Sequence, residues 1–390
     1  MTLNLDKSAW KRAAIGDVVQ NLNVTVKDPS AEGIDRIIAM EHLDPGELKI
    51  SRWGDLADGT TFTRRVRPGQ TLFGKRRAYQ RKAAYAEFDA ICSGDILVFQ
   101  ADPLKILPEF LPFLVQSNSF YDHALGTSAG SLSPRTNWRD LANYEFELPP
   151  LDDQKRVAAL MWAIQEAIKD TAAVQHAISR ARSTWLDTQV REALDCRSAA
   201  FSSVWSQSPE SGWSAPPVDE VTGRFVLSLA ALGPNGYRTG CLKNVPQTAE
   251  VDAKTLSSGD LLISRANTVD MVGRAAIFPE ARSDVSFPDT MMRLHLLPEV
   301  LPEFAVAVLM SGPGRKHMRR TAAGSATSMV KINRKTLGEL VFPVISTDEQ
   351  RAITNQVNVF DCAVDRRSTE AKRLTDLKSA VGKLVFGGSS

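Results

Sequence analysis

The chain has 390 residues, 43% of them apolar and 24% charged, with a formal net charge of +2. This composition is typical of a globular protein with two cores, and no apolar stretch is long enough to cross a bilayer. The first residues lack a basic segment followed by an apolar one, and the four cysteines and five histidines show no paired spacing. A cytoplasmic protein without membrane contact, disulfide framework or metal site is therefore expected.

Residues 1–150 are predicted to form a first α+β domain. Short apolar stretches at 34–40, 96–99, 110–115 and 144–148 are separated by segments rich in Gly, Pro and Asp. Pro149 and Pro150 then close the domain, because proline continues neither a strand ladder nor a helix interior.

A long central helix is predicted over 151–196. Asp152 and Asp153 occupy the positions where acidic residues favour a helix start, and neither Gly nor Pro follows for more than forty residues. Apolar residues recur at a spacing near 3.5, at Val157, Met161, Ile164, Ile168, Ile178 and Trp185.

Residues 197–346 are predicted to form a second domain. Its serine-rich start, 197–215, is interpreted as a connection, 224–229 and 261–264 as strands, and 233–236 as a turn. A second long helix is expected over 347–386, where Thr347 and Gln350 have the spacing of a capping box and Gly387-Gly388 ends the pattern.

The two helices would each be roughly 50 to 65 Å long, more than one domain diameter. The simplest partner for the narrow apolar stripe of one is the other, paired antiparallel like a coiled coil. Gln175 and Arg182 interrupt the stripe, so helices of other subunits could cover the remainder. In the alternative interpretation, each helix lies on its own domain.

Part of the sequence occurs twice, which predicts an internal repeat with a pseudo-twofold axis. The repeated strings are Ser-Gly-Asp (93–95 and 258–260), Leu-Pro-Glu-Phe (107–110 and 301–304), Ala-Gly-Ser (129–131 and 323–325) and an Asp-x-Gln before each helix. The segments that follow Trp10 and Trp213 are also similar to each other.

Each half contains one basic run. Residues 59–86 and 304–338 include no acidic residue, and one such run in each half favours the binding of a polyanion. Arginine and lysine neutralise phosphates, and arginine, asparagine and glutamine also bind base edges. The candidate DNA-binding residues are Arg64, Arg65, Lys75, Arg76, Arg77, Tyr79, Arg81, Lys82, Arg265, Asn267, Arg274, Arg315, Lys316, Arg319, Arg320 and Lys331.

Catalytic motifs are not recognisable. The string 69–75 fits G-x-x-x-x-G-K, but Arg76 stands where a phosphate-binding loop needs a hydroxyl for magnesium. No methyltransferase motif, dinucleotide fingerprint or nucleophile elbow is present.

The motifs together resemble one family over nearly the whole chain, the specificity subunit of type I restriction-modification enzymes. The strings that carry the resemblance are 72–79, 91–99, 107–111, 126–131 and 148–154 in the first half, and 259–267, 272–274 and 287–290 in the second.

The resemblance implies two target-recognition domains, each reading one half of a bipartite target in double-stranded DNA, for phage defence. It implies no catalysis and no bound cofactor in this chain: S-adenosylmethionine, ATP and Mg would bind partner subunits. Two methyltransferase subunits would dock on the helices, and restriction/translocase subunits would join the complex. The expected subunit interface consists of Val157, Met161, Ile164, Ile168, Ile178, Ile353, Val357, Phe360, Val364 and Leu374.

Two other hypotheses stay open at this point. A non-reading scaffold subunit of a DNA-modifying or defence complex would have solvated basic runs. A phosphate-loop enzyme would hydrolyse ATP in a manner that depends on Lys75.

Overall fold

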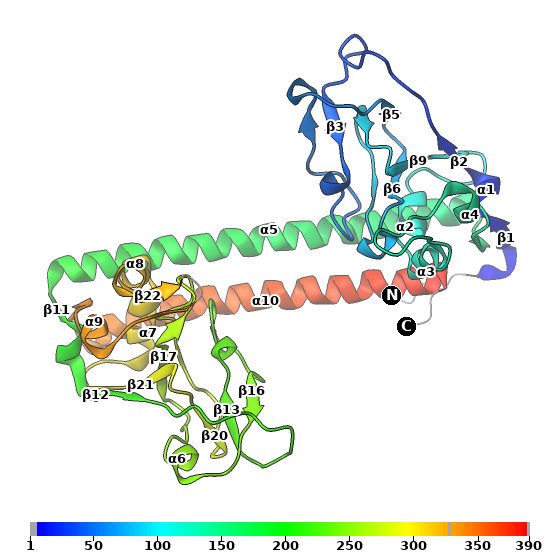
Figure 1. Ribbon diagram of the computed structural model, residues 1–390. Coiled ribbons are helices and arrows are strands. Elements are labelled where there is room, and N and C mark those ends of the chain that lie inside the picture. Colours follow the sequence, from blue (N-terminus) through cyan, green and yellow to red (C-terminus); the bar gives the residue numbers. More distant parts are fainter. Residues whose placement is uncertain (1–5, 327–328, 388–390) are drawn as a thin grey trace. The chain divides into compact units, whose positions relative to one another are not determined.

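The computed structural model describes residues 6–326 and 329–387, so residues 1–5, 327–328 and 388–390, with Gly388 of the predicted helix end, lie outside the described residues. The chain divides into two compact units. Unit 1 contains Met1–Ala172 and Thr369–Ser390, and unit 2 contains Ala173–Ser368. Each unit therefore includes one globular domain and one end of both long helices, α5 (Leu151–Cys196) and α10 (Thr347–Phe386) (Figure 1).

The domain of unit 1 is built around a four-stranded sheet with the order β2-β9-β6-β7. A second four-stranded sheet has the order β4-β3-β8-β5, and β1 pairs with β10. The elements are η1 (Lys7–Ala9), β1 (Lys11–Ala14), α1 (Ile15–Val18), β2 (Val19–Leu22), β3 (Arg36–Ile38), η2 (Met40–His42), β4 (Gly54–Asp55), η3 (Leu56–Asp58), β5 (Arg64–Val66), β6 (Thr71–Gly74), η4 (Ala78–Gln80), β7 (Ala83–Tyr85), β8 (Ala90–Cys92), β9 (Ile96–Ala101), α2 (Leu111–Val115), α3 (Asn118–Gly126), α4 (Trp138–Leu141) and β10 (Glu145–Leu148).

Alternation along the central strands places two separate cores on the two faces of this sheet. Phe73, Leu97 and Phe99 are buried in a core shared with α2, α3 and the ends of α5 and α10. Their neighbours Leu72 and Val98 are buried in a second core with β3, β5 and β8. Because successive residues of a strand face opposite sides, each strand contributes to both layers.

Unit 2 repeats this architecture with a four-stranded sheet of the order β12-β21-β17-β19. Its small sheets have the orders β16-β13-β20, β14-β15 and β18-β23-β22, and β11 pairs with β24. The elements are β11 (Ser198–Ala200), η5 (Phe201–Val204), β12 (Trp205–Ser211), β13 (Phe225–Leu227), η6 (Leu229–Ala231), β14 (Leu232–Gly233), β15 (Gly236–Tyr237), β16 (Leu242–Asn244), α6 (Ala249–Asp252), β17 (Leu261–Ser264), β18 (Ala266–Asn267), β19 (Ala275–Ile277), β20 (Val285–Ser286), β21 (Met291–Leu296), α7 (Pro302–Met310), α8 (Gly312–Thr321), β22 (Ala323–Ala326), β23 (Met329–Lys331), α9 (Arg334–Gly338) and β24 (Val341–Pro343).

The segment 197–215 is part of the second domain, so its interpretation as a connection is wrong. Phe201 and Val204 are buried in the core of unit 2, and β12 forms an edge of the main sheet by pairing with β21. Serine-rich composition hid the strand, because serines on the solvent side of an edge strand look like those of a loop.

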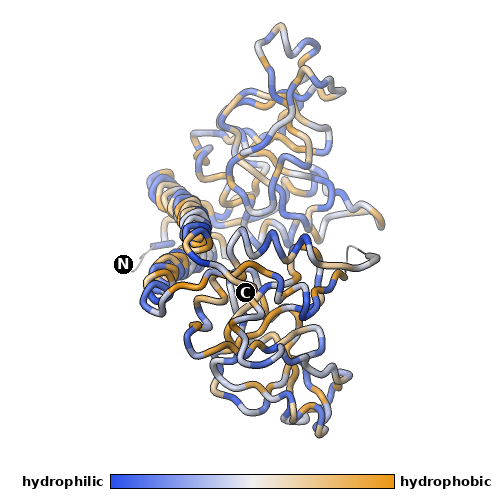
Figure 2. The backbone as a smooth tube through the Cα atoms, turned by 90° about the vertical axis from the view of Figure 1, so that its left-hand side faces the viewer, coloured by the Kyte–Doolittle hydropathy of each residue, from blue (hydrophilic) through white to orange (hydrophobic). Residues whose placement is uncertain are grey.

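Both long helices are amphipathic, with hydrophilic and hydrophobic positions in turn along their length (Figure 2). In unit 2 they pair antiparallel: Gln175 donates to Ser368 Oγ at 3.0 Å, and Arg182, seven residues on, donates to Asp361, seven residues back, at 3.0 Å. In unit 1, Lys378 of α10 donates to Gln165 of α5 at 2.6 Å. The polar residues that interrupt the stripe therefore have partners on the other helix, and the expected fold class, α+β domains with two long antiparallel helices, is confirmed.

The start of α10 differs from the prediction. The capping box is formed by Ser346 and Glu349, with Ser346 N to Glu349 Oε2 at 2.8 Å and Glu349 N to Ser346 Oγ at 3.3 Å. Thr347 and Gln350 have the same spacing one residue later, but Thr347 already lies within the helix. Gln350 instead forms hydrogen bonds with main-chain groups of the preceding domain.

Gln154 and Gln350 form the same clamp in the two units. Gln154 accepts a hydrogen bond from Leu107 N (2.8 Å) and donates to the carbonyls of Lys105 and Pro149 (2.9 and 2.8 Å). Gln350 accepts from Leu301 N (2.9 Å) and donates to the carbonyls of Glu299 and Ile345 (2.9 and 3.0 Å). The repeated Leu-Pro-Glu-Phe and Asp-x-Gln strings therefore mark equivalent positions.

Two of the repeated features, the Ser-Gly-Asp strings and the two tryptophans, do not occupy equivalent positions. Ser-Gly-Asp at 93–95 precedes β9 and that at 258–260 precedes β17, but the sheet orders make β21 the counterpart of β9 and β6 the counterpart of β17. Trp10 precedes β1, whereas Trp213 follows β12, the counterpart of β2. Ser-Gly-Asp is a common turn signal, so its recurrence did not require a common position.

None of the helices in the described ranges combines the length and the apolar character needed to span a membrane.

Candidate nucleic-acid interface

In unit 1, basic residues gather where the chain leaves β6. Arg76 forms a β-bridge with Arg135, which also bridges Ala129. Backbone hydrogen bonds fix the loop: Lys75 N donates to Asp95 O (3.0 Å), Thr136 N to Lys75 O (3.0 Å) and Arg77 N to Pro134 O (2.7 Å). We call Lys75, Arg76, Arg77 and Arg135 the first basic edge.

The first basic edge keeps an excess of positive charge. Arg76 and Arg135 share one carboxylate, that of Asp95, at 3.6 and 3.4 Å. Within the described part of the chain, Lys75 and Arg77 make no ion pair, and Arg77 is exposed. Arg135 was missed by the sequence analysis, because it lies outside the acid-free run and approaches Arg76 only in the folded chain.

Unit 2 places a second basic edge at the equivalent position. Ala266, in β18, pairs with Lys331 of β23, which in turn pairs with Ala323, as Arg76, Arg135 and Ala129 do in unit 1. Arg265 N donates to Thr290 O (2.8 Å) and Ile332 N to Arg265 O (2.9 Å), the counterparts of the bonds at Lys75. Arg265, Asn267 and Lys331 form this second basic edge.

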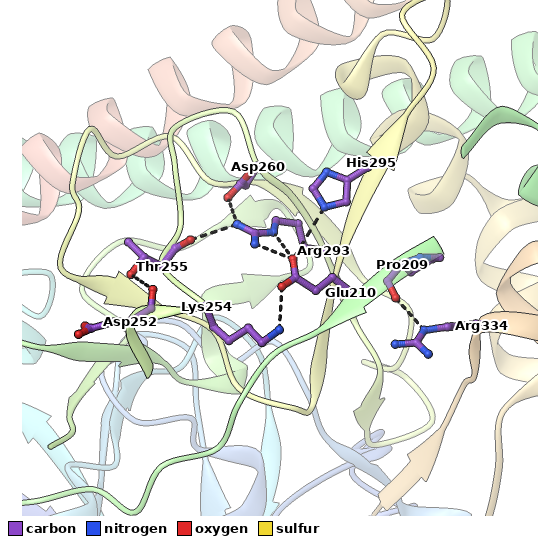
Figure 3. A network of polar contacts seen from close by, with 9 residues as sticks. All are labelled: Pro209, Glu210, Asp252, Lys254, Thr255, Asp260, Arg293, His295 and Arg334. Carbon is purple, nitrogen blue, oxygen red and sulfur yellow. Dashed lines mark hydrogen bonds and ion pairs between the residues drawn. The ribbon is translucent and has the colours of Figure 1, made fainter. Parts of the chain in front are cut away.

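The second basic edge borders a hollow of about 290 Å³ that is lined by Ser211, Arg265, Met292, Asn333, Arg334 and Lys335. Among the residues that the structure describes, the side chain of Arg265 donates only to a peptide carbonyl, Asp289 O, at 3.3 Å. Arg334 donates to Pro209 O at 2.7 Å, which fixes its guanidinium beside β12 (Figure 3). Cations held by carbonyls rather than carboxylates keep their charge available to an anion.

A neighbouring network in unit 2 shows the opposite arrangement. Arg293 donates to Glu210 (2.6 Å) and Asp260 (2.9 Å), and Lys254 donates to Glu210 (2.8 Å) (Figure 3). Burial raises the pKa of Glu210, but the hydrogen bonds from Lys254 and Arg293 lower it, and the net shift is downward. These cations are neutralised inside the fold, in contrast to those of the basic edge.

Three residues of the predicted DNA-binding set have structural partners instead. Arg65 pairs with Asp89 (3.0 Å) and with Glu32, and only 19% of its side chain is exposed. Arg64 donates to Asn23 (2.8 Å) and to Ile96 O, and Lys82 donates to Met40 O (2.6 Å). Acidic residues from elsewhere in the sequence neutralise Arg65, whereas Arg64 and Lys82 are held by Asn23 and by main-chain carbonyls.

Arg77, Tyr79 and Arg81 lie on the short helix η4 and its two flanks. Arg77 and Arg81 have φ values of 55° and 53°, a left-handed conformation unusual for side chains larger than glycine or asparagine. Tyr79 is 55% exposed, whereas Arg81 stacks on the buried ring of Tyr121 at 4.7 Å and donates to Asn118. Tyr79 and Arg77 are therefore open to a partner beside the first basic edge.

The remaining predicted residues lie in one region of unit 2. Arg315, Lys316, Arg319 and Arg320 belong to α8, and Arg274 directly precedes β19. Lys316, Arg319 and Arg320 are exposed, but Arg315 is 8% exposed.

The residues expected at the subunit interface are largely enclosed by the chain itself. Val157, Met161 and Ile164 are buried in unit 1, Ile353 and Val357 in unit 2, and Phe360 contacts Trp185. Ile168, Ile178, Val364 and Leu374 are half-buried. The stripe thus serves packing within the chain, and its contact with other subunits stays a prediction. The exposed apolar side chains of the two helices include Val174, Val359, Leu377 and Leu384.

The string that resembles a phosphate-binding loop is a strand. Thr71–Gly74 is β6, fully buried and hydrogen-bonded to β7 and β9 on its two sides. Its N–H groups therefore lie in a sheet ladder and cannot surround a phosphate.

No protein-family model matches the sequence. The chain is 30% identical over 151 residues to the EcoDI specificity subunit of a type I restriction enzyme from Escherichia coli. That match covers 38% of this chain and 33% of the relative, so it spans only a third of the relative's length.

Solved structures match nearly the whole chain. One is the type I restriction-modification specificity subunit from M. genitalium, with a TM-score of 0.59, 13% identity and coverage of 100% of this chain and 99% of the other. The chain has the fold of a type I specificity subunit.

A second match comes from a study of assembly and conformational transition in a type I restriction-modification system. It has a TM-score of 0.62, 20% identity and coverage of 97% of this chain and 98% of the other. The resemblance seen in the motifs is thus confirmed as a specificity-subunit fold. In that fold, the two basic edges lie at equivalent places of the two units.

Proposed function

We propose that this chain is the DNA-recognition subunit of a type I restriction-modification complex, in which each unit reads one half of a bipartite target. The observation that carries the proposal is the repetition of a basic edge at the same strand end of both units. Phosphate contacts would position the duplex, and Arg77, Tyr79, Arg265 and Asn267 are the side chains available for base edges.

The chain itself would be non-catalytic. Methyltransferase subunits would dock on α5 and α10, where Val174, Val359, Leu377 and Leu384 offer apolar contacts. S-adenosylmethionine would bind those subunits, and ATP and Mg the restriction subunit. The assembly would act in the cytoplasm.

The test is the methylation pattern that the chain directs. Co-expressed with its methyltransferase in a host without methylation of its own, it should direct adenine methylation to a single bipartite motif, read by methylome sequencing. Methylation at sites that share no bipartite motif would contradict the proposal. So would the absence of methylation when the complex is expressed in soluble form.

A non-reading scaffold is the second candidate, since Arg64, Arg65 and Lys82 show that part of one basic run serves the fold. Charge reversal at Arg76, Arg77 and Arg265 distinguishes the two. A scaffold would leave DNA binding by the assembly unchanged, whereas the affinity of a reading subunit should fall at least tenfold, because three cationic side chains at the DNA become repulsive anions.

A further inference from the structure

Three arginines of unit 2 converge at the junction between α8 and the loop that precedes β19. Arg315 and Arg319 lie one turn apart on α8, so they share a face of the helix. Arg274 Nε and Arg315 Nη2 both donate to the same carbonyl, Asp270 O, at 3.3 and 3.1 Å. The guanidinium groups of Arg274 and Arg315 are therefore held close together.

The chain neutralises this cluster only in part. Arg315 is 8% exposed, and its Nη1 has no hydrogen-bond partner among the described residues. The one carboxylate that pairs here in the described structure is Asp270, 3.8 Å from Arg319 and 83% exposed. Burial, followed by the charges of Arg274 and Arg319, lowers the pKa of Arg315 to about 10, so the group still carries its charge at neutral pH.

A purely structural arginine in this fold has a different environment. Arg293, also largely buried, is paired with Glu210 and Asp260. The fold itself does not require the cluster either: the position of Arg315 on α8 corresponds to that of Tyr121 on α3, since each lies four residues after the capping serine, Ser311 or Ser117. At the corresponding position of unit 1, the guanidinium of Arg81 lies over the ring of Tyr121.

We propose that Arg274, Arg315 and Arg319 form a binding site for a phosphodiester of the DNA backbone. Arg319 and Arg274, which reach the surface, would contact the phosphate oxygens, and Arg315 would add its charge from beneath. The proposal rests on the proposed DNA-binding function. A polymer fits better than a small phosphate, because Lys316 and Arg320 continue the positive surface along α8.

The first experiment is the salt dependence of duplex binding by the full chain with its methyltransferase partner, measured by fluorescence anisotropy. Arg319→Gln and Arg274→Gln should each weaken binding roughly five- to tenfold, equally for target and non-target duplexes. Each should also reduce the slope of log K against log salt by about one. Arg12→Gln, which removes an exposed arginine of β1 that is already paired with Glu145, is the matched control and should change neither value.

The second experiment separates binding from folding. Arg315→Met keeps the side-chain volume and removes the unpartnered charge, so thermal stability without DNA should stay equal or rise while duplex binding weakens. Inorganic phosphate at constant ionic strength should raise the melting temperature of the wild type more than that of Arg315→Met. Duplex DNA should compete with this phosphate.

The outcomes separate the two proposals. If the wild-type complex binds duplex DNA and the variants bind with the same salt dependence, the role of the cluster is contradicted and the recognition function is not. Phosphate binding that duplex DNA does not displace would assign the site to a small anion and overturn the DNA assignment. A wild-type complex without any duplex binding would overturn both.

Discussion

Gln154 and Gln350 each join the start of a long helix to the domain before it through three hydrogen bonds. Both side chains are almost fully buried, at 0% and 2% exposure. A buried amide with every polar atom bonded to main-chain groups fixes geometry, because any displacement leaves donors and acceptors unpaired. These two residues therefore set the direction in which each helix leaves its domain.

Replacement of Gln350 by alanine should lower the free energy of unfolding by about 2 to 4 kcal/mol, because three hydrogen bonds are lost and buried carbonyls stay unpaired. Urea unfolding followed by tryptophan fluorescence measures the change. Gln247→Ala, at an exposed position, is the control. If the free energy of unfolding falls no more than in the control, water must satisfy the main-chain groups that Gln350 binds.

Glu210 makes unit 2 sensitive to acid. Its pKa is lowered in the folded state, so its contribution to stability is complete above the ordinary value of 4.5 and is lost as the pH falls through the lower folded value. We expect the melting temperature of the wild type to fall more steeply below pH 4.5 than that of Glu210→Gln. Equal slopes in scanning calorimetry would mean that Arg293 and Lys254 do not stabilise the carboxylate.

At the scale of elements, the sequence predicted secondary structure best in long segments, where the apolar pattern repeats many times. Two helices of about forty residues have enough apolar repeats to be recognised without tertiary information. Short strands lack this advantage, and β12 was interpreted as a connection because an edge strand with solvent-facing serines shows little alternation. The capping box of α10 was placed one residue late, since two overlapping pairs have the required spacing.

The two possible capping boxes predict different effects of mutation. Ser346→Ala should cost about 1 kcal/mol, because its hydroxyl accepts the Glu349 N–H and its own N–H is bonded in return. Thr347→Ala, within the first turn, should change stability by only a few tenths of that amount. Equal losses in urea unfolding would contradict the assignment.

At the scale of the whole molecule, each unit has its own sheet, its own cores and its own basic edge. Changes at one edge should therefore affect one half of a recognised sequence and leave the other half intact, as additivity holds for sites that share no partners. This independence is a property of the fold that no single residue reveals.

Arg77→Ala in the first basic edge should relax one half of the methylated motif, and Asn267→Ala in the second should relax the other half. Each loss of a base contact should reduce discrimination at its position by about 1 to 3 kcal/mol. Methylome sequencing of the two variants gives both results. Relaxation of the same half by both variants would contradict independent reading.

The sequence by itself determined the two long helices, the duplicated domains and the presence of one basic run in each half. These properties depend on composition and on spacing along the chain, which is local information. Only the tertiary structure decided which strings are equivalent and which cations are free. Arg65 is neutralised by Glu32 and Asp89, whereas Arg135 joins Arg76 beside a shared Asp95. Charge balance is set by neighbours in space, and these come from distant parts of the sequence.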